Sequence, residues 1–311
     1  MNIVFMGSGE FGEASLRMLV NKGHRILCVV TPPDKKQDRG MSIGSTPIKR
    51  AAVELGLTVY QPVDINMPES VAYLNGLKPD FIVVIAYGQK LSQKILDIPL
   101  ILPLNIHASL LPAYRGAAPI NWAIINGEKV TGVTLMKVTL RMDTGPVIHQ
   151  KPAEILGSDT AVTLGRRLSV DASEVLIEGI SGLVKGAYAF VPQDESKASV
   201  APKLIRANGL IDWNKPAQAL VNLVRGCAPW PGAYTHYKGK LIKIHKVSPV
   251  SCAVAGALPA GRIARISKEG IVVTASDGFL LIESLQMEGK RMISAGEFIA
   301  GYKVREQDTL G

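Results

Sequence analysis

Two polar side chains at the end of an apolar run have the clearest capacity for chemistry in this 311-residue chain. Asn105 and His107 stand two positions apart at the end of residues 102–107, and a loop rich in glycine and proline follows them. In a β-strand, residues two positions apart share a face, so both side chains would point into the same space. Because ligands of open α/β sheets bind beyond the carboxyl ends of the strands, we predict that this pair lies in a site.

A carboxylate farther along the chain can complete this group. Asp143 follows the apolar run at residues 133–138, and it would reach the same edge of the sheet if that run is a neighbouring strand. The Asn105 amide could then donate to a developing oxyanion, an effect worth about 2.7–4 kcal/mol in comparable sites, and His107 could act as a second donor or as an acid. Asp143 could orient the imidazole and relay a proton between two nitrogens, a contribution of roughly a hundred- to ten-thousand-fold. These roles predict direct acyl transfer through a tetrahedral intermediate, with no covalent enzyme intermediate.

Two further motifs leave other enzyme classes open. The triplet Asp-Thr-Gly at residues 143–145 also occurs in aspartic proteases, but those need two such carboxylates and this chain has no second copy. Residues 7–12 (GSGEFG) fit the dinucleotide fingerprint and favour a nicotinamide oxidoreductase. That fingerprint also expects an acidic residue at the end of the second strand, where residues 31–33 are TPP. The glycines can instead serve a tight strand-to-helix turn.

Composition and charge narrow the class of partner. The formal net charge is +9 at pH 7, which favours a polyanionic partner and keeps a noncatalytic RNA-binding protein as a third hypothesis. The three cysteines, at positions 28, 227 and 252, lack the spacing of a metal site or of a disulfide framework. Residues 1–7 have no basic region of a signal peptide and are too short to span a membrane. We therefore expect a cytoplasmic protein that binds no metal and no membrane.

The first half of the chain predicts an α/β domain that would position these residues. Up to about residue 155, short apolar runs alternate with helical patterns, which is typical of a Rossmann-like, mostly parallel sheet covered by helices. The predicted strands comprise residues 3–6, 26–30, 81–85, 102–107 and 133–138. The predicted helices run from Thr46-Pro47 to Gly56, from Asn66 to Gly76, and from about residue 160 to 184.

The second half predicts a smaller β domain. Residues 189–197 are polar and unperiodic, so we place a linker at 190–206, between a catalytic domain at 1–189 and a domain at 207–311. Beyond the linker, short strands alternate with tight turns, which predicts an OB-like β-barrel. The predicted strands there are residues 261–266, 271–275 and 279–285. Ser294 and Glu297 form a capping box that would begin a last short helix.

Residues 105–119 and the later aspartate resemble the catalytic signature of the folate-dependent formyltransferases. Asn105, His107, the loop at 109–116 and Asp143 match the family's Asn-x-His, SLLP-x-[YW]-RG and downstream Asp. The similarity continues through residues 211–213 (IDW) and 229–231 (PWP), and it is greatest for members that act on methionyl initiator tRNA. The resemblance implies that Asn105, His107 and Asp143 are catalytic and that 10-formyltetrahydrofolate is the donor cosubstrate.

The resemblance also implies binding residues for both substrates. The folate pterin would contact the loop before Asp143 and the residues Ile85, Ala86, Tyr87, Gly88, Ser109, Leu110, Leu111 and Pro112. The tRNA would contact Lys35, Lys36 and Arg39. The basic charge of the second domain, rather than the resemblance, makes Lys203 and Arg206 plausible phosphate contacts. Residues 31–41 resemble the insertion that probes the acceptor end of initiator tRNA, with Arg39 at the position of the family's key arginine. The chain departs from the commonest pattern in being less basic after Arg39.

The small β domain carries further basic and aromatic residues. Lys240, Lys243 and Lys246 could contact phosphate or could simply face solvent. We expect Trp213 and Trp230 to pack within the domain rather than to stack on bases.

The implied function is transfer of the formyl group of 10-formyltetrahydrofolate to the free amino group of methionyl initiator tRNA, giving formylmethionyl-tRNA for translation initiation. An amino sugar or another small amine remains the alternative acceptor, because the catalytic chemistry does not depend on the acceptor. We expect the enzyme to be a monomer.

Overall fold

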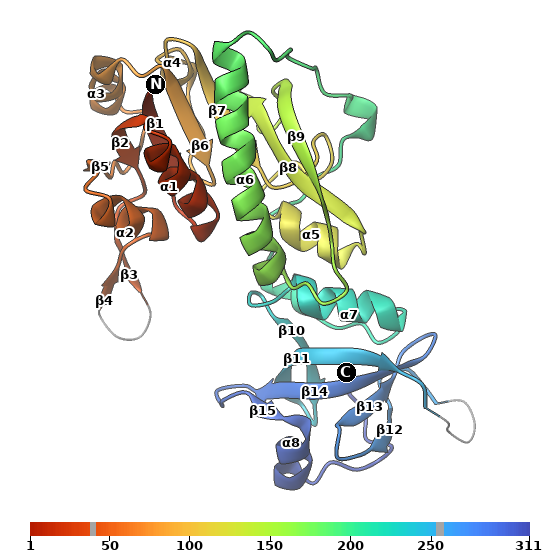
Figure 1. Cartoon of the computed structure of the whole chain (residues 1–311). Helices are drawn as coiled ribbons and strands as arrows, with labels where there is room; N and C mark the ends of the chain where they lie inside the picture. The colour runs from red at the N-terminus through yellow and green to blue at the C-terminus, as the bar shows by residue number, and fades with distance from the viewer. Residues whose placement is uncertain (38–41, 253–257) are drawn as a thin grey trace. The chain divides into compact units, whose positions relative to one another are not determined.

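The computed structural model describes residues 1–37, 42–252 and 258–311, which fold into two compact units (Figure 1). The N-terminal unit comprises Met1–Pro119, Val130–Glu154 and Gly165–Pro202. The C-terminal unit comprises Ile120–Lys129, Ile155–Leu164 and Lys203–Gly311. Within the described ranges, no helix has the length and apolar character needed to cross a membrane.

A seven-stranded sheet forms the centre of the N-terminal unit in the described chain, in the order β5-β2-β1-β6-β7-β8-β9. The strands are β1 (Asn2–Gly7), β2 (Arg25–Val30), β5 (Val59–Tyr60), β6 (Phe81–Ile85), β7 (Leu102–His107), β8 (Val130–Lys137) and β9 (Val147–Glu154). The first five strands in this order run parallel, whereas β8 pairs antiparallel with both β7 and β9. The predicted mostly parallel sheet is confirmed. The sequence did not predict β5, which is very short, or β9, whose polar residues hide the strand pattern.

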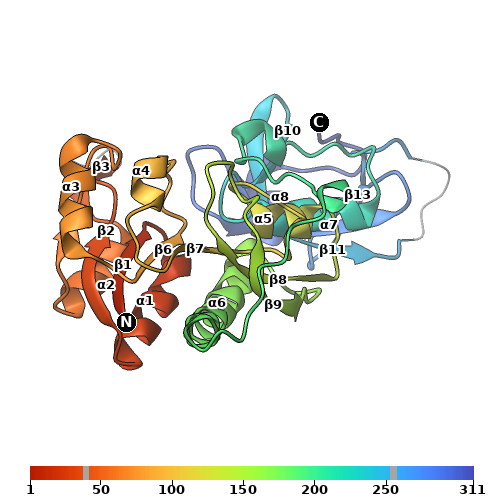
Figure 2. The same ribbon diagram turned by 90° about the horizontal axis from the view of Figure 1, so that it is seen from above.

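Helices cover both faces of this sheet. Figure 2 shows α1 (Glu13–Asn21) and α6 (Ala161–Val184) on one face, and α3 (Pro68–Leu77) and α4 (Gln93–Leu96) on the other. A further helix, α2 (Pro47–Glu54), packs beside α1. As predicted, Thr46 caps α2, because its hydroxyl accepts a hydrogen bond from the Lys49 amide at 3.1 Å.

The predicted limits of the second helix were wrong. Helix α3 begins at Pro68, and Gly76 lies inside its last turn, which ends at Lys78 in the left-handed conformation (φ 48°). Asn66 does not cap the helix because its side chain joins two loops. The amide donates to the Lys90 carbonyl at 3.0 Å, and the amide oxygen accepts from the Ser92 backbone at 2.8 Å.

The C-terminal unit contains a six-stranded antiparallel sheet, counted over its described residues. The strands are β10 (Ala233–Tyr237), β11 (Lys240–Val250), β12 (Ile263–Ile266), β13 (Ile271–Thr274), β14 (Phe279–Met287) and β15 (Ile293–Ser294). The chain end links the two edge strands, because Leu310 pairs with Tyr237 in β10 and Thr309 pairs with Arg262 beside β12. The predicted antiparallel β domain is therefore confirmed. Its last helix, α8 (Ala295–Tyr302), begins with the predicted capping box of Ser294 and Glu297.

Two segments from earlier in the chain belong to the C-terminal unit because they contact α7 (Ala217–Gly226). In α5 (Pro119–Ile125), the Asn121 side chain donates to the Gly226 carbonyl at 2.8 Å. Arg225 donates to the carbonyl of Leu156 at 2.8 Å. These contacts join residues far apart in the sequence, and the alternation of strands and helices therefore does not predict them.

The glycine-rich turn after β1 is a place of close packing. A Cβ atom at Gly7 would lie 3.0 Å from both the Ile85 carbonyl oxygen and the Phe5 ring. A Cβ atom at Gly12 would lie 3.3 Å from the Ile85 side chain, whereas nothing lies within 4 Å of that position at Gly9. The first and last glycines of the motif are thus explained by packing against β6, without a bound nucleotide.

We expect Gly7→Ala to lower the free energy of unfolding by about 1–3 kcal/mol, because the added methyl group overpacks the turn. Gly9→Ala is the matched control, since its backbone is extended and its Cβ position is open, and it should change stability by less than about 0.5 kcal/mol. Urea unfolding followed by circular dichroism measures both values. Equal losses in the two variants would contradict the packing role.

Candidate active site

Strand β7 carries Asn105 and His107. Asn105 pairs with Val84 in β6 and with Met136 in β8, so it sits where the parallel and antiparallel parts of the sheet meet. His107 is the last residue of β7, and the two side chains share one face of the strand. The imidazole is buried, with 6% of the residue exposed, and Asn105 is partly exposed. The predicted pair therefore lies at the carboxyl end of a central strand.

The Asp143 carboxylate lies beside this imidazole. Its Oδ2 is 3.7 Å from Nδ1 of His107, and it accepts a hydrogen bond from the Gly116 amide at 2.9 Å. On the other side of the ring, Nε2 lies 2.8 Å from the Tyr114 carbonyl oxygen, and it must donate because a carbonyl only accepts. The ring is thereby oriented with Nδ1 toward the carboxylate. This arrangement can hold and move one proton between Asp143 and a substrate that enters beside it.

The loop after β8 holds Asp143 in an uncommon backbone conformation. Asp143 has φ 54°, in the left-handed region, and two hydroxyls stabilise the turn before it. Thr139 and Thr144 both donate to the Arg141 carbonyl, at 3.1 and 3.0 Å. Gly145 follows, and a Cβ there would overlap the carbonyl oxygen of Lys137. The Asp-Thr-Gly triplet thus fits a closely packed turn.

The loop after β7 is anchored on β8 and β9. The Thr134 hydroxyl donates to the Ser109 carbonyl at 2.7 Å and accepts from the Leu111 amide at 3.1 Å. Gln150 in β9 donates to the Leu111 carbonyl at 2.9 Å. Ser109 is fully buried, and its hydroxyl donates to the Ala113 carbonyl at 2.6 Å. These contacts fix the path of the chain from His107 to Gly116.

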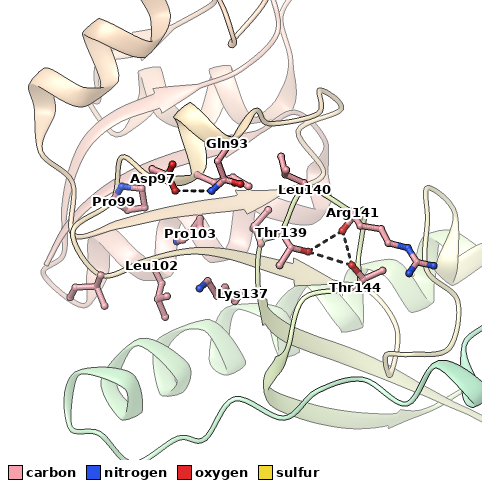
Figure 3. Close-up of a pocket in the computed structure, with 13 residues that line it drawn as sticks. Gln93, Asp97, Pro99, Leu102, Pro103, Lys137, Thr139, Leu140, Arg141 and Thr144 are labelled. Carbon is pink, nitrogen blue, oxygen red and sulfur yellow. Dashed lines mark hydrogen bonds between the residues drawn. The ribbon is translucent and has the colours of Figure 1, made fainter.

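A cavity of about 700 Å³ opens on the Asp143 loop (Figure 3). Its walls are formed by three parts of the chain: α4 and the segment after it, the start of β7, and the loop after β8. Its lining residues are Gln93, Leu96, Asp97, Pro99, Ile101, Leu102, Pro103, Lys137, Val138, Thr139, Leu140, Arg141 and Thr144. Figure 3 shows the Gln93 amide bonded to Asp97 on one side and the Arg141 turn on the other. Six of these thirteen residues are polar or charged, and neither Asn105 nor His107 is among them.

Most of the folate residues implied by the resemblance lie away from this cavity, beyond the carboxyl ends of β6 and β7, whereas the cavity is lined by the start of β7. The loop before Asp143 lines the cavity, but none of the other eight positions does. Ile85 and Tyr87 are buried, and burial raises the pKa of the Tyr87 phenol, so its side chain stays neutral. Ala86 and Gly88 are exposed in the loop after β6. The contribution of α4 and of the start of β7 to the cavity could not be predicted from the sequence, because neither segment carries a polar motif.

The structure describes four of the five residues predicted to bind tRNA. Lys35 and Lys36 belong to β3 (Lys35–Gln37), which pairs with β4 (Ser42–Gly44). Arg39 lies outside the described residues. Lys203 and Arg206 are exposed in the C-terminal unit.

Arg206 lines a second cavity, of about 330 Å³, within the C-terminal unit. Trp230 and Tyr234 line it too, together with Lys243. Trp230 is 54% exposed, so the expectation that it packs within the domain was wrong; it lies in the loop between α7 and β10. Trp213 packs as expected, with 5% exposed and its indole donating to Thr235 at 3.1 Å.

Two family models match most of this chain. Residues 1–180 match the family model described as formyl transferase, and residues 203–303 match the formyl transferase C-terminal domain. The methionyl-tRNA formyltransferase of Halothermothrix orenii is 45% identical over 316 aligned positions, which cover 100% of each chain.

Solved structures with much lower identity share the fold. WlaRD, a sugar 3N-formyl transferase solved in the presence of dTDP and 5-N-formyl-THF, has a TM-score of 0.68 at 18% identity, over 94% of this chain and 99% of that one. HypX from Aquifex aeolicus, in complex with tetrahydrofolic acid, has a TM-score of 0.63 at 18% identity. That match covers 99% of this chain and 50% of HypX, so this chain spans about half of HypX. From its match to the family model and its identity over the full length, this chain belongs to the formyl transferase family, among the methionyl-tRNA formyltransferases.

Proposed function

We propose that the protein transfers the formyl group of 10-formyltetrahydrofolate to the free amino group of methionyl initiator tRNA. The observation that carries this proposal is the placement of Asn105 and His107 on one strand face, with the Asp143 carboxylate 3.7 Å from the imidazole. The name of the Halothermothrix orenii relative supports methionyl-tRNA as the acceptor, and the folates in two solved structures that share the fold support the class of donor. The product, formylmethionyl-tRNA, would serve translation initiation.

The donor folate would bind beyond the carboxyl ends of β6 and β7, where the implied positions at 85–88 and 109–112 follow the two strands. Asn105 and His107 lie at the same end of β7, so a donor bound there would have its formyl group beside them. Two solved structures that share the fold were determined with folates, which supports this choice of ligand.

The three polar residues would divide the chemistry of direct transfer. The methionyl amine attacks the formyl carbon, and the Asn105 amide donates to the oxyanion that forms. His107 would donate a second hydrogen bond from Nδ1 in the doubly protonated ring, because its Nε2 hydrogen is already bonded to the Tyr114 carbonyl. Asp143 accepts the proton that the amine loses and returns it, directly or through a water, to the leaving folate nitrogen. One proton leaves one nitrogen and reaches the other, so no group on the protein is consumed.

The acceptor tRNA would contact the C-terminal unit as well as the β3–β4 segment. Arg206 and Lys243 supply positive charge beside the exposed ring of Trp230, and this combination of cations with an aromatic face suits a nucleic acid. Lys203 lies in the same segment as Arg206. Lys35, Lys36 and Arg39 would contact the acceptor end. We further propose that the functional division follows residues 1–189, 190–206 and 207–311, and that the enzyme acts as a monomer in the cytoplasm, without a metal.

Formylation of an amino sugar is the second candidate function. The observation in its favour is the fold shared with WlaRD. The 45% identity over the full length to a methionyl-tRNA formyltransferase, together with the net charge of +9, favours the tRNA.

We expect Asn105→Ala to lower kcat by about a hundred- to a thousand-fold, because the oxyanion would lose a donor. Release of tetrahydrofolate during turnover with methionyl initiator tRNA gives the rate. Asn75→Ala, at an exposed position in α3, is the control and should keep the rate of the unaltered enzyme. An unchanged kcat in Asn105→Ala would remove this residue from the proposed mechanism.

We expect Asp143→Asn to lower kcat by about a hundred- to ten-thousand-fold while the dissociation constant for the folate changes little. The amide oxygen can still accept from the Gly116 amide, so the turn is kept and only the proton relay is lost. Single-turnover kinetics and folate binding by fluorescence give the two quantities. A loss of folate affinity as large as the loss of rate would point to a structural role.

We expect Arg206→Ala to weaken tRNA binding and to reduce the slope of log affinity against log salt concentration by about 1, because one phosphate contact is lost. Filter binding at several salt concentrations measures this slope. Lys185→Ala, which removes an exposed cation of the N-terminal unit, is the control and should leave the slope as it is. The same slope in all three proteins would exclude Arg206 from the interface.

A further inference from the structure

The backbone of Asp143 needs support from outside its own loop. Its left-handed conformation (φ 54°) is unfavourable for a residue with a side chain, and the carboxylate is aimed correctly only while that conformation holds. The hydroxyls of Thr139 and Thr144 hold the part of the turn that precedes Asp143. The carbonyl groups of Asp143 and Gly145 point the other way, toward residues 191–201.

Gln193 binds both of those carbonyl groups. Its Nε2 donates to the Asp143 carbonyl at 2.9 Å and to the Gly145 carbonyl at 2.7 Å. One primary amide thus uses both of its hydrogens on the two residues that flank Thr144. A shift of Asp143 out of the left-handed conformation would turn its carbonyl and break the first of these bonds.

Arg115 fixes which way the Gln193 amide points. Its Nε and Nη2 donate to the Gln193 Oε1 at 3.0 and 2.7 Å. If the amide were flipped, its NH₂ group would point at the N–H groups of Arg115, and neither could accept a hydrogen bond. Arg115 is only 8% exposed, and its other edge makes a bidentate contact with Glu195 at 3.0 and 2.8 Å. This contact holds the pKa of the Glu195 carboxyl below its ordinary range. The guanidinium is therefore held on two sides.

The same short segment also holds the carboxylate itself. Gly116, next to Arg115, donates its amide to the Asp143 Oδ2 at 2.9 Å. The Arg115 backbone pairs with the chain that follows Gln193, donating to the Ser199 carbonyl at 2.8 Å and accepting from the Ala201 amide at 2.6 Å. The backbone of residues 115–116 thus fixes one end of Asp143, and the Arg115 side chain fixes the other end through Gln193.

We propose that Gln193, oriented by Arg115, is a positioning residue that keeps the Asp143 carboxylate within reach of His107 and of the reacting amine. Residues 191–201 are then part of the active site and not only a connection between domains. This inference rests on the proposed function, because it requires Asp143 to act in the reaction.

The test replaces the Gln193 amide with a carboxylate of the same shape. Gln193→Glu can still accept from Arg115, but it loses both donors to the carbonyls of Asp143 and Gly145. We expect kcat to fall about 10- to 100-fold, as for a small displacement of a catalytic group, with KM for both substrates unchanged and with the protein still fully folded under assay conditions, as urea titration shows. Gln218→Glu makes the same chemical change at an exposed position of α7 and should keep full activity.

A double-variant comparison separates action through Asp143 from a general structural role. In the Asp143→Asn background, Gln193→Glu should lower kcat by less than about 3-fold, because the group that it positions is already lost. The same fold loss in both backgrounds, full kcat in Gln193→Glu, or a loss of kcat that follows a loss of stability would each overturn the inference. If the unaltered enzyme transfers no formyl group to methionyl initiator tRNA, the proposed function fails and the inference fails with it.

Discussion

The separation of 3.7 Å between the Asp143 carboxylate and the His107 imidazole is the constraint on which the rest of the N-terminal unit depends. The fold fixes the two groups in different ways. His107 is fixed by β7, which is hydrogen-bonded on both sides, and by the Tyr114 carbonyl. Asp143 belongs to a loop and has a conformation that its own residue type disfavours, so it depends on Gly116, on Gln193 and on the lack of a side chain at Gly145. The fold thus holds a side chain from a regular strand and a side chain from an irregular loop close together, and proton transfer requires such fixed positions.

The parts that the sequence could predict are those with a local signal. The period of two places Asn105 and His107 on one face, and the Thr46-Pro47 start of α2 follows from side-chain capping and from the fixed φ of proline. The cavity beside Asp143 had no such signal, because its walls come from α4, the start of β7 and the loop after β8, and ordinary apolar residues form most of them. The role of Gln193 could not be predicted either, because it depends on contacts with residues 48 to 78 positions earlier in the chain. The exposure of Trp230 could not be predicted, because tryptophan is on average a largely buried residue type and its type does not show the conformation of the loop in which it lies.

The structure also explains why motifs that favour other functions are present. The glycine-rich run after β1 lets the chain pass close to Ile85, so its first and last glycines serve packing between β1 and β6. In the Asp-Thr-Gly triplet, the aspartate has a left-handed conformation and the glycine lies too close to the Lys137 carbonyl to carry a side chain. Its likeness to aspartic proteases is limited to the three residue types. In both motifs, geometry rather than the pattern decides the role.

The central claim is that this site formylates the amino group of methionyl initiator tRNA, and the most direct measurement is a comparison of acceptors. Radiolabelled formyl transfer from 10-formyltetrahydrofolate would be followed to methionyl initiator tRNA, to methionyl elongator tRNA and to an amino sugar nucleotide. The account predicts rapid transfer to the initiator tRNA and little to the other two acceptors. Transfer to the amino sugar alone, by protein that binds the folate, would contradict the assigned acceptor while leaving the chemistry of Asn105, His107 and Asp143 in place.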